Sequence, residues 1–395
     1  MKIDDRADRV IGREGAQGKE AMSISTPQVR IGVSGWRYEP WRGVFYPADL
    51  QHRLELRYAA SIFRTLEING SFYSLQRPAS WRQWYADVPA GFVFAVKGPR
   101  YLTHMLKLRE IEQPLANFLA SGVLALNEKL GPILWQFPPQ MRFDPERFEP
   151  FLSRLPKNTA DALAMARTCD ARMRGRSHLA IDSARTLRHA VEIRHESFLD
   201  PRFVAMLRAH GVALVIAETA RKWPMPRDVT ADFMYLRLHG DKELYRSGYR
   251  PAAIRRWADR IRAWHEGGEP ASLPPGAVRI AEPATRARAG RDVYCFFDNT
   301  DVKLRAPADA QSLMRCLGQV PGHSTETTVR TTQPSPARRA TSPAVAGEVK
   351  SRSKRPSPAR RATSPAVAGE VKSRSKRPSP ARRGTARAAV GQTRR

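Results

Sequence analysis

Two charged side chains interrupt a short apolar run of the sequence. The run HAVEIRH, residues 189–195, alternates Val191 and Ile193 with Glu192 and Arg194. Because successive side chains of a β-strand point to opposite faces, the aliphatic pair and the charged pair should lie on opposite faces of a sheet. A carboxylate beside a guanidinium can serve acid–base chemistry or hold an anionic ligand, so this run is the first candidate for a functional site.

Four other apolar runs carry polar side chains in their carboxyl-terminal halves. In each run these side chains take the parity opposite to that of the large apolar residues. The polar residues are Glu67, Asn69, Lys97, Gln136, Arg237 and His239. The charged members need a partner or a ligand, because an isolated charge is costly to bury.

Apolar β-type runs recur along the sequence with helical patterns between them. The runs are 30–36, 64–70, 92–98, 132–139, 189–195, 212–219, 233–240 and 292–299. Intervening segments such as 49–64, 200–211 and 252–267 place apolar residues three and four positions apart, as amphipathic helices do. This alternation predicts an α/β protein with a single (β/α)8 TIM barrel. A doubly wound open sheet is the alternative, but the GVSGW of the first run is not a GxGxxG phosphate-binding pattern.

In such a barrel the active site lies at the carboxyl-terminal ends of the strands. We therefore expect the inward polar side chains to converge there. They either pair with one another in a structural network or form a ligand site. The ligand site is the favoured interpretation, because Val, Ile and Leu would fill the same space without the cost of removing charges from water.

The formal net charge of the chain is +29, and much of the excess lies near its carboxyl terminus. Residues 330–395 hold 18 Lys and Arg against two acidic residues, and the 22-residue sequence 334–355 recurs unchanged at 356–377. The repeats lack aromatic residues and large apolar clusters, so we expect disorder. Such a basic chain binds nucleic-acid phosphates with little sequence preference. A solvated tail without a partner is the alternative.

These features divide the chain into a flexible leader, 1–28, a barrel domain, 29–320, and a disordered basic tail, 321–395. The three cysteines form no CxxC pair, which favours a reducing compartment. The sequence has neither an apolar run of ~18 residues nor the apolar stretch of a signal peptide. We expect a cytoplasmic protein without membrane contact, and the tail favours association with the nucleoid.

Longer motifs surround the polar residues. They are GVSGWRYEPWRGVFYP (32–47), TLEINGSFYSL (65–75), FAVKGPRYLTHM (94–105), VEIRHESF (191–198) and YLRLHGDKELYRSGY (235–249). In this order they resemble the YecE-like proteins, the family catalogued as domain of unknown function 72, although Phe198 stands where that family has Trp. The resemblance implies a TIM barrel with a shared pocket, and it implies no particular reaction.

The first functional hypothesis is an enzyme, a hydrolase or lyase, that acts on a phosphorylated or nucleic-acid-related anionic substrate. Its anion would be held by Lys97, Arg194 and Arg237. The carboxylates would act as general base and the imidazoles as general acid. The catalytic candidates are Glu67, Glu192, His195 and His239. Further substrate-binding candidates are Trp36, Asn69, Tyr73, Gln136 and Asn299.

Two other hypotheses stay open. A sugar-type isomerase or lyase would act on a small substrate, and a single divalent metal would draw on Glu67, Glu192, His239 and Asp298, although the sequence itself requires no cofactor. A non-catalytic barrel would bind nucleic acid or a small ligand. Ser34 is not predicted to be a nucleophile, because GVSGW lacks the GxSxG spacing.

Overall fold

The computed structural model describes residues 26–299 and 304–321. The leader predicted over 1–28 and the tail predicted over 321–395 lie almost wholly outside the described residues. Within the described ranges, no helix is long and apolar enough to cross a membrane.

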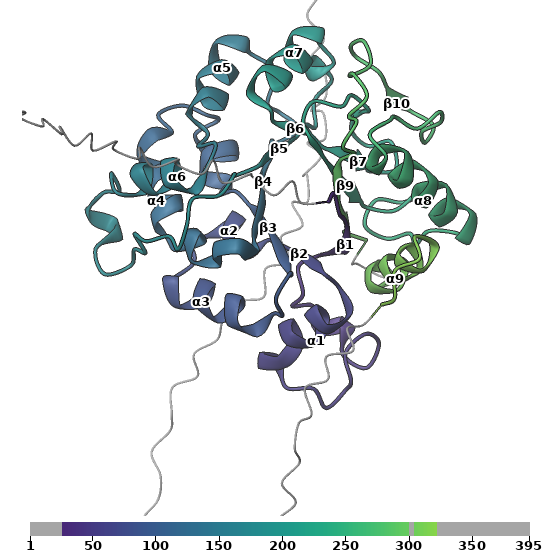
Figure 1. Ribbon diagram of the computed structural model, residues 1–395, viewed down its shortest axis with the longest axis horizontal. Helices are drawn as coiled ribbons and strands as arrows, with labels where there is room; N and C mark the ends of the chain where they lie inside the picture. Colours follow the sequence, from purple (N-terminus) through teal and green to yellow (C-terminus); the bar gives the residue numbers. More distant parts are fainter. Residues whose placement is uncertain (1–25, 300–303, 322–395) are drawn as a thin grey trace, which may run out of the picture. The chain divides into compact units, whose positions relative to one another are not determined.

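A nearly closed parallel sheet forms the centre of the barrel domain (Figure 1). Nine strands of the described residues belong to it, in the order β6-β5-β4-β3-β2-β1-β11-β9-β7. They are β1 (Val29–Ser34), β2 (Thr65–Ile68), β3 (Val93–Lys97), β4 (Leu130–Gln136), β5 (His189–Glu192), β6 (Ala213–Leu214), β7 (Ile216–Glu218), β9 (Phe233–Leu238) and β11 (Asp292–Phe297). Every strand of this sheet lies within, or extends at most two residues beyond, one of the β-type runs expected from the sequence, so the α/β class and a TIM-barrel-like fold are confirmed.

The sheet closes through a single run of the sequence. Residues 212–219, expected as one strand, form two short strands separated by Val215. The first of these, β6, pairs with β5, and the second, β7, pairs with β9 on the other side. The two edges of the sheet are therefore consecutive in the chain, and this is why the arrangement is barrel-like rather than an open sheet.

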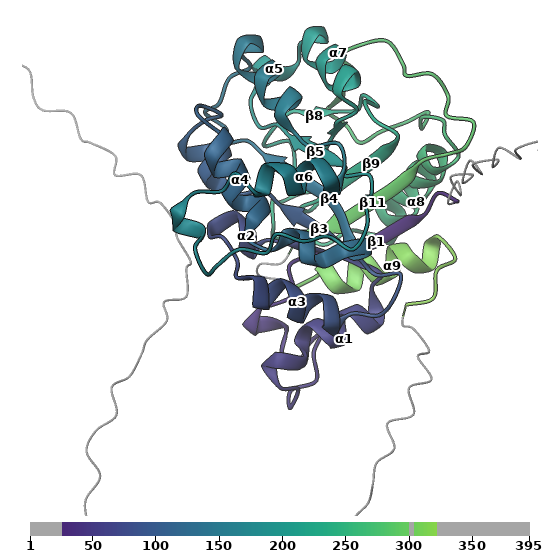
Figure 2. The ribbon, with the colours of Figure 1, turned by 60° about the vertical axis from the view of Figure 1, so that its left-hand side comes forward.

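Helices surround the sheet on its outer face (Figures 1 and 2). They are α1 (Glu55–Ile62), α2 (Gly70–Tyr73), α3 (Pro78–Asp87), α4 (Glu112–Ala120), α5 (Pro145–Arg154), α6 (Thr159–Ala166), α7 (Pro201–His210), α8 (Pro251–His265) and α9 (Ala306–Cys316). In α7 the Asp200 side chain accepts a hydrogen bond from the Arg202 amide at the start, and Gly211 ends the helix with a φ of 65°. Both are common ways of satisfying the backbone groups at helix ends.

A second, two-stranded sheet lies in the connections outside the barrel. It joins β8 (Met225–Pro226) to β10 (Ala277–Val278). The Asp228 carboxylate supports it by accepting hydrogen bonds from the amides of Ile280 and Ala281, each at 2.9 Å. The stretch 266–291 is thus tied back to the connection between β7 and β9.

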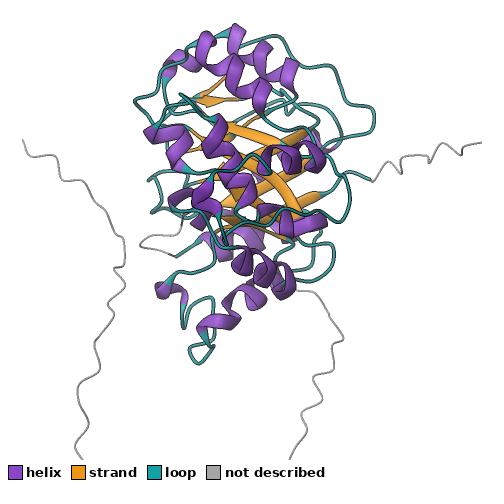
Figure 3. Ribbon diagram, turned by 90° about the vertical axis from the view of Figure 1, so that its left-hand side faces the viewer, coloured by secondary structure: helices purple, strands orange, loops and turns teal. Residues whose placement is uncertain are grey.

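Side chains alternate along each barrel strand and so form two apolar layers. The strands that carry them lie behind a layer of helices in Figure 3. Outward residues such as Val191, Ile193 and Leu236 pack with the helices in one large cluster. The inward cluster consists of Ala95, Leu134, Ala190, Ala213, Val215, Ala217, Phe233, Tyr235, Tyr294 and Phe296. Aromatic rings on β9 and β11 thus meet alanines on β3, β5, β6 and β7, so large side chains fill the space that small ones leave. The parity predicted from the sequence is confirmed.

Candidate functional site

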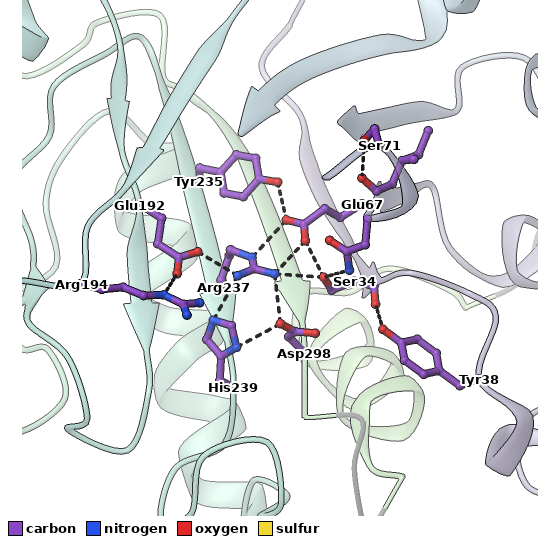
Figure 4. A network of polar contacts seen from close by, with 12 residues as sticks. Ser34, Tyr38, Glu67, Ser71, Glu192, Arg194, Tyr235, Arg237, His239 and Asp298 are labelled. Atoms are coloured by element: carbon purple, nitrogen blue, oxygen red, sulfur yellow. Dashed lines mark hydrogen bonds and ion pairs between the residues drawn. The ribbon is translucent and has the colours of Figure 1, made fainter. Parts of the chain in front are cut away.

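Arg237, on β9, is the centre of a charged network at the carboxyl end of the barrel (Figure 4). Its guanidinium donates to Glu67 from Nε at 3.1 Å and from Nη2 at 2.8 Å. Nη1 donates to Glu192 Oε2 at 2.8 Å, and Nη2 donates to Asp298 Oδ2 at 3.0 Å. The described residues therefore give this guanidinium three carboxylate partners, and little of its donor capacity is left for a ligand.

Glu67, on β2, is as fully occupied as Arg237. Besides the guanidinium, its carboxylate accepts from the Tyr235 hydroxyl at 2.7 Å and from the Ser34 hydroxyl. Ser34 in turn accepts from Asn69 Nδ2 at 2.9 Å and from Arg237 Nη2 at 3.1 Å. Each carboxylate oxygen has two donors, so Glu67 serves as a buried counter-ion.

A glycine allows this contact between β1 and β2. A Cβ atom at Gly32 would lie 2.0 Å from the Thr65 carbonyl oxygen, which is far closer than any real contact. The strands pair with Gly32 opposite Thr65, and two residues later Ser34 lies opposite Glu67. Ser34 thus links the two strands within the network, a role that its sequence motif did not reveal.

Glu192, at the end of β5, joins two arginines. Its Oε1 accepts from Arg194 Nε at 2.9 Å, and its other oxygen accepts from Arg237. Burial disfavours the ionised carboxyl, but Arg194 and Arg237 outweigh it and hold the pKa of Glu192 far below its ordinary value. The Arg194 guanidinium also lies 3.8 Å above the ring of Trp223. Glu192 is therefore ionised throughout the physiological range, which makes it a weak base.

His239 and Asp298 form a second buried pair beside Arg237. His239 Nδ1 lies 3.1 Å from Asp298 Oδ2, close enough for electrostatic attraction but not aligned for a hydrogen bond. Burial lowers the pKa of His239, so the imidazole is neutral at pH 7. Burial opposes ionisation of Asp298, yet Arg237 and His239 lower the pKa of that carboxyl. Asp298 adds a third carboxylate to the two that the alternation of strands predicted inside the barrel.

Lys97, the last residue of β3, differs from the other charged groups of the site. It is 9 % exposed, and within residues 26–299 and 304–321 its ammonium makes neither an ion pair nor a hydrogen bond. Nζ lies 4.4 Å from the centre of the Phe72 ring. Burial and the nearby Arg237 lower the pKa of Lys97 to about 8, with Glu67 and Glu192 opposing the change. Lys97 is thus a buried cation held mainly by a ring face.

Two residues that the sequence hypotheses did not use lie close to these cations. His104 follows β3 in a π-helical turn, Tyr101–Met105, and burial, Lys97 and Arg194 lower its pKa to about 4. Tyr245 packs its ring edge-on against His239, 5.2 Å between centres, and burial raises its pKa to about 12. His104 lies in the loop that follows the run carrying Lys97. A titratable residue at the carboxyl end of a barrel strand is a candidate on position alone, so the sequence held a signal for it. Tyr245 lies in a loop with a φ of 63°, where no alternation rule applies.

The other predicted residues lie apart from the Arg237 network. Trp36 is buried against Trp84, with ring centres 5.5 Å apart. His195 caps the short helix after β5, where its ring accepts from the Ser197 amide at 3.0 Å. Tyr73 is 65 % exposed on α2. The structure therefore brings together Glu67, Glu192, Arg194, Arg237 and His239, with Asn69 attached through Ser34 and Lys97 beside them.

Asn299 and Gln136 complete the predicted set. Asn299 Nδ2 donates to the Ser247 carbonyl at 3.2 Å and to Asp309 Oδ2 at 2.9 Å, which ties the loop after β9 to α9. Gln136 ends β4 opposite Glu192 and is 4 % exposed. Its amide has no hydrogen-bond partner in the part of the chain that the structure describes. In the same part, no group of three or more His, Cys, Asp or Glu is arranged to hold a metal ion.

Fold and site define the class of this protein: a TIM-barrel-like domain with a buried charged network at the carboxyl ends of its strands. The chain belongs to the family described as "Protein of unknown function DUF72", whose model matches residues 30–336. This confirms the resemblance seen in the sequence motifs. A comparison with curated proteins finds no match.

Crystal structures of two family members are similar in fold. A DUF72 family protein from Thermotoga maritima MSB8 is 23 % identical, and the match covers 74 % of this chain and 99 % of that one with a TM-score of 0.54. A DUF72 family protein from Enterococcus faecalis V583 is 17 % identical, with 74 % and 96 % covered and a TM-score of 0.50. Both support the barrel architecture.

Proposed function

We propose that the carboxyl end of the barrel binds a small anionic substrate that carries a phosphate, and that the chain is an enzyme acting on it. The observation that carries this proposal is the difference between two cations. Arg237 has three carboxylate partners, whereas Lys97 has none among the described residues. A buried ammonium without a counter-ion is unfavourable, and a bound anion would supply the missing charge.

Arg194 is the second cation that supports an anionic ligand. Its Nε donates to Glu192, while Nη1 and Nη2 have no hydrogen-bond partner in the described ranges. The guanidinium is held flat on Trp223, so its two outer nitrogens keep a fixed direction. Arg194 also lowers the pKa of Lys97, after burial and Arg237, which indicates that the positive charges lie near one another. Lys and Arg together are the usual protein ligands of phosphate.

The same geometry argues against the two glutamates as acid–base groups. Glu67 and Glu192 act as counter-ions of the arginines, because hydrogen bonds from those side chains occupy their oxygens. Tyr245, with its pKa raised by burial to about 12, stays protonated at neutral pH and is suited to donate a hydrogen bond to the substrate. His104, with its pKa lowered to about 4, stays neutral but is a weak base. We therefore assign Tyr245 and His104 to hydrogen bonding with the substrate rather than to proton transfer.

The binding proposal is tested by calorimetric titration of the full chain with pyrophosphate at fixed ionic strength. We expect Lys97→Met to weaken binding at least tenfold, equivalent to about 1.4 kcal/mol. The control is Lys107→Met, which removes an equal charge from an exposed position after the π-helical turn. The proposal is wrong if both variants bind as the parent does, or if both lose the same affinity.

We further propose that residues 330–395 bind nucleic acid and hold the barrel near it. Support comes from their 18 basic against two acidic residues, since such segments release counter-ions from phosphate backbones. Binding of duplex DNA should weaken steeply with salt and disappear from a chain that ends at residue 329. If the shortened chain keeps its DNA affinity, nucleic acid binds the barrel domain instead.

A further inference from the structure

We propose that Lys97 is the reacting group of this site: its amine forms an imine with a carbonyl carbon of the substrate while Arg194 holds the substrate's anionic group. The part played by Arg194 rests on the proposed anion-binding function. The part played by the amine stands on the surroundings of Lys97 alone. The substrate class is therefore an aldehyde or ketone that also bears a phosphate or carboxylate.

The backbone and ring contacts of Lys97 fix its amine in place. The Lys97 carbonyl oxygen accepts from the Ser71 hydroxyl at 2.7 Å, which ties the end of β3 to α2. The next residue of α2, Phe72, lies under Nζ with 4.4 Å between the nitrogen and the ring centre. With no hydrogen bond from the described residues, the nitrogen lone pair is not committed to another group once the proton leaves.

Charged groups on several neighbouring elements lie near this amine. They are Glu67 on β2, Glu192 and Arg194 at the end of β5, Arg237 on β9, Asp298 after β11 and His104 after β3. Burial first, and then Arg237, bring the pKa of Lys97 down to about 8. At pH 7 about 10 % of the side chain is then neutral, against about 0.03 % for an ordinary lysine. Desolvation beside other cations is a known way of making a lysine nucleophilic.

A second buried lysine provides a matched contrast. Lys129 precedes β4 and is 6 % exposed, and burial lowers its pKa as well. Its ammonium, however, donates to the carbonyl oxygens of Tyr85 and Val88, both at 2.8 Å. These hydrogen bonds occupy its protons and direct it away from any ligand. Burial alone therefore does not make a lysine reactive, and Lys129 serves as the internal control.

The proposed step is balanced without a further reactant. The neutral amine attacks the carbonyl carbon, a C–N bond forms, and a proton moves from nitrogen to the former carbonyl oxygen. The C–O bond of the resulting carbinolamine then breaks, the hydroxyl group leaves with the remaining proton of the nitrogen as water, and a C=N bond forms. No oxidant or reductant takes part, and Arg194 keeps its contact with the anionic group throughout.

The test is reductive trapping on the full chain with sodium cyanoborohydride and two small aldehydes. Glyoxylate carries a carboxylate and acetaldehyde carries no charge. Peptide mass spectrometry then gives the labelling rate of each lysine. We expect Lys97 to be labelled at least tenfold faster than Lys107 and Lys129 with glyoxylate, with a rate that rises with pH up to about 8.

Two variants separate the parts of the proposal. Arg194→Gln should slow labelling of Lys97 by glyoxylate but not by acetaldehyde. Lys97→Arg should keep pyrophosphate binding and lose the labelled peptide. The imine proposal is overturned if Lys97 reacts no faster than Lys107 with either aldehyde. If Lys97 reacts selectively but pyrophosphate does not bind, the amine is reactive and the anion-binding function is wrong.

Discussion

Lys97 and Lys129 are both buried, and each lies against an aromatic ring. They lie at opposite ends of the barrel. Lys129 stands before β4, at the amino-terminal end of the parallel strands, and its ammonium is bonded to two backbone carbonyls. Lys97 ends β3, at the carboxyl-terminal end, and within the described part of the chain its ammonium contacts the Phe72 ring but makes no hydrogen bond. A residue type and a degree of burial therefore do not identify a functional site. What distinguishes Lys97 from Lys129 is that its ammonium has no hydrogen-bond or ion-pair partner among the described residues.

The two ends of the barrel differ in the same way as the two lysines. At the amino-terminal end Arg188 forms ion pairs with Asp292 and Asp232, and Arg30 forms one with Asp292. Each of these charged groups therefore has a partner of opposite charge. At the carboxyl end Arg237 is equally satisfied, but the Lys97 ammonium and two nitrogens of Arg194 have no hydrogen-bond partner in the ranges 26–299 and 304–321. A stability network and a candidate ligand site thus lie side by side, and variants can separate them.

The largest effect is expected from Arg237→Met. Removing the guanidinium leaves Glu67, Glu192 and Asp298 buried without their main counter-ion, which should lower the free energy of unfolding by about 3–5 kcal/mol. Urea unfolding measures this, with Arg255→Met on the exposed face of α8 as the control. A loss below about 1 kcal/mol would show that the network adds little to stability.

A smaller loss is expected from Lys129→Met. The carbonyls of Tyr85 and Val88 would lose a charge-assisted donor, at a cost of about 2 kcal/mol in the free energy of unfolding. The same urea experiment reports it. An unchanged or increased stability would mean that the two carbonyls find other donors, and the contrast between the lysines would then weaken.

Acid should destabilise the carboxyl end of the barrel. The pKa values of Glu192, Asp298 and His239 are all lowered in the folded chain, so the unfolded chain binds more protons as the pH falls. Stability should therefore decline below about pH 6.5 through His239 and further below about pH 4.5 through the carboxyls. The free energy of unfolding of the parent and of Glu192→Gln, measured between pH 7 and 3, checks this. It should decline less steeply with falling pH in the variant. Equal declines in the two proteins would contradict the lowered pKa of Glu192.

The smallest effect is expected from Trp223→Leu. The ring supports Arg194 from one face, a contact worth about 0.5–1 kcal/mol, so pyrophosphate affinity should fall roughly two- to fivefold. Calorimetry with the same variant measures it. A loss as large as that of Lys97→Met would mean that Trp223 itself contacts the ligand.

Much of the barrel and part of the site could be predicted from the sequence. Alternation within each run assigned Glu192 and Arg237 to the interior, because the period of a strand is independent of its neighbours. Which side chains meet depends on the register between strands, and this is why the Ser34–Glu67 contact and the central position of Arg237 were not foreseen. The break at Val215 was also missed, since both halves of that run are equally apolar.

Loop residues were the least predictable part of the site. Trp223, Tyr245 and Asp298 follow strands rather than belong to them, so no periodicity gives their direction. Asp298 entered the sequence hypotheses only as one of several metal ligands. In the structure it is a counter-ion of Arg237 and lies beside His239.

The most direct test of the account is the free energy of unfolding of Lys97→Met at pH 7. The pKa of Lys97 is lowered from 10.5 to about 8, so burying its charged ammonium lowers the free energy of unfolding. This loss is fully present below pH 8 and vanishes as the pH rises to 10.5. The account predicts that the variant is more stable than the parent by about 2–4 kcal/mol at pH 7, with the gain disappearing above pH 10.5. A variant that loses stability, as Lys129→Met should, would show that Lys97 is a structural residue and would contradict the account.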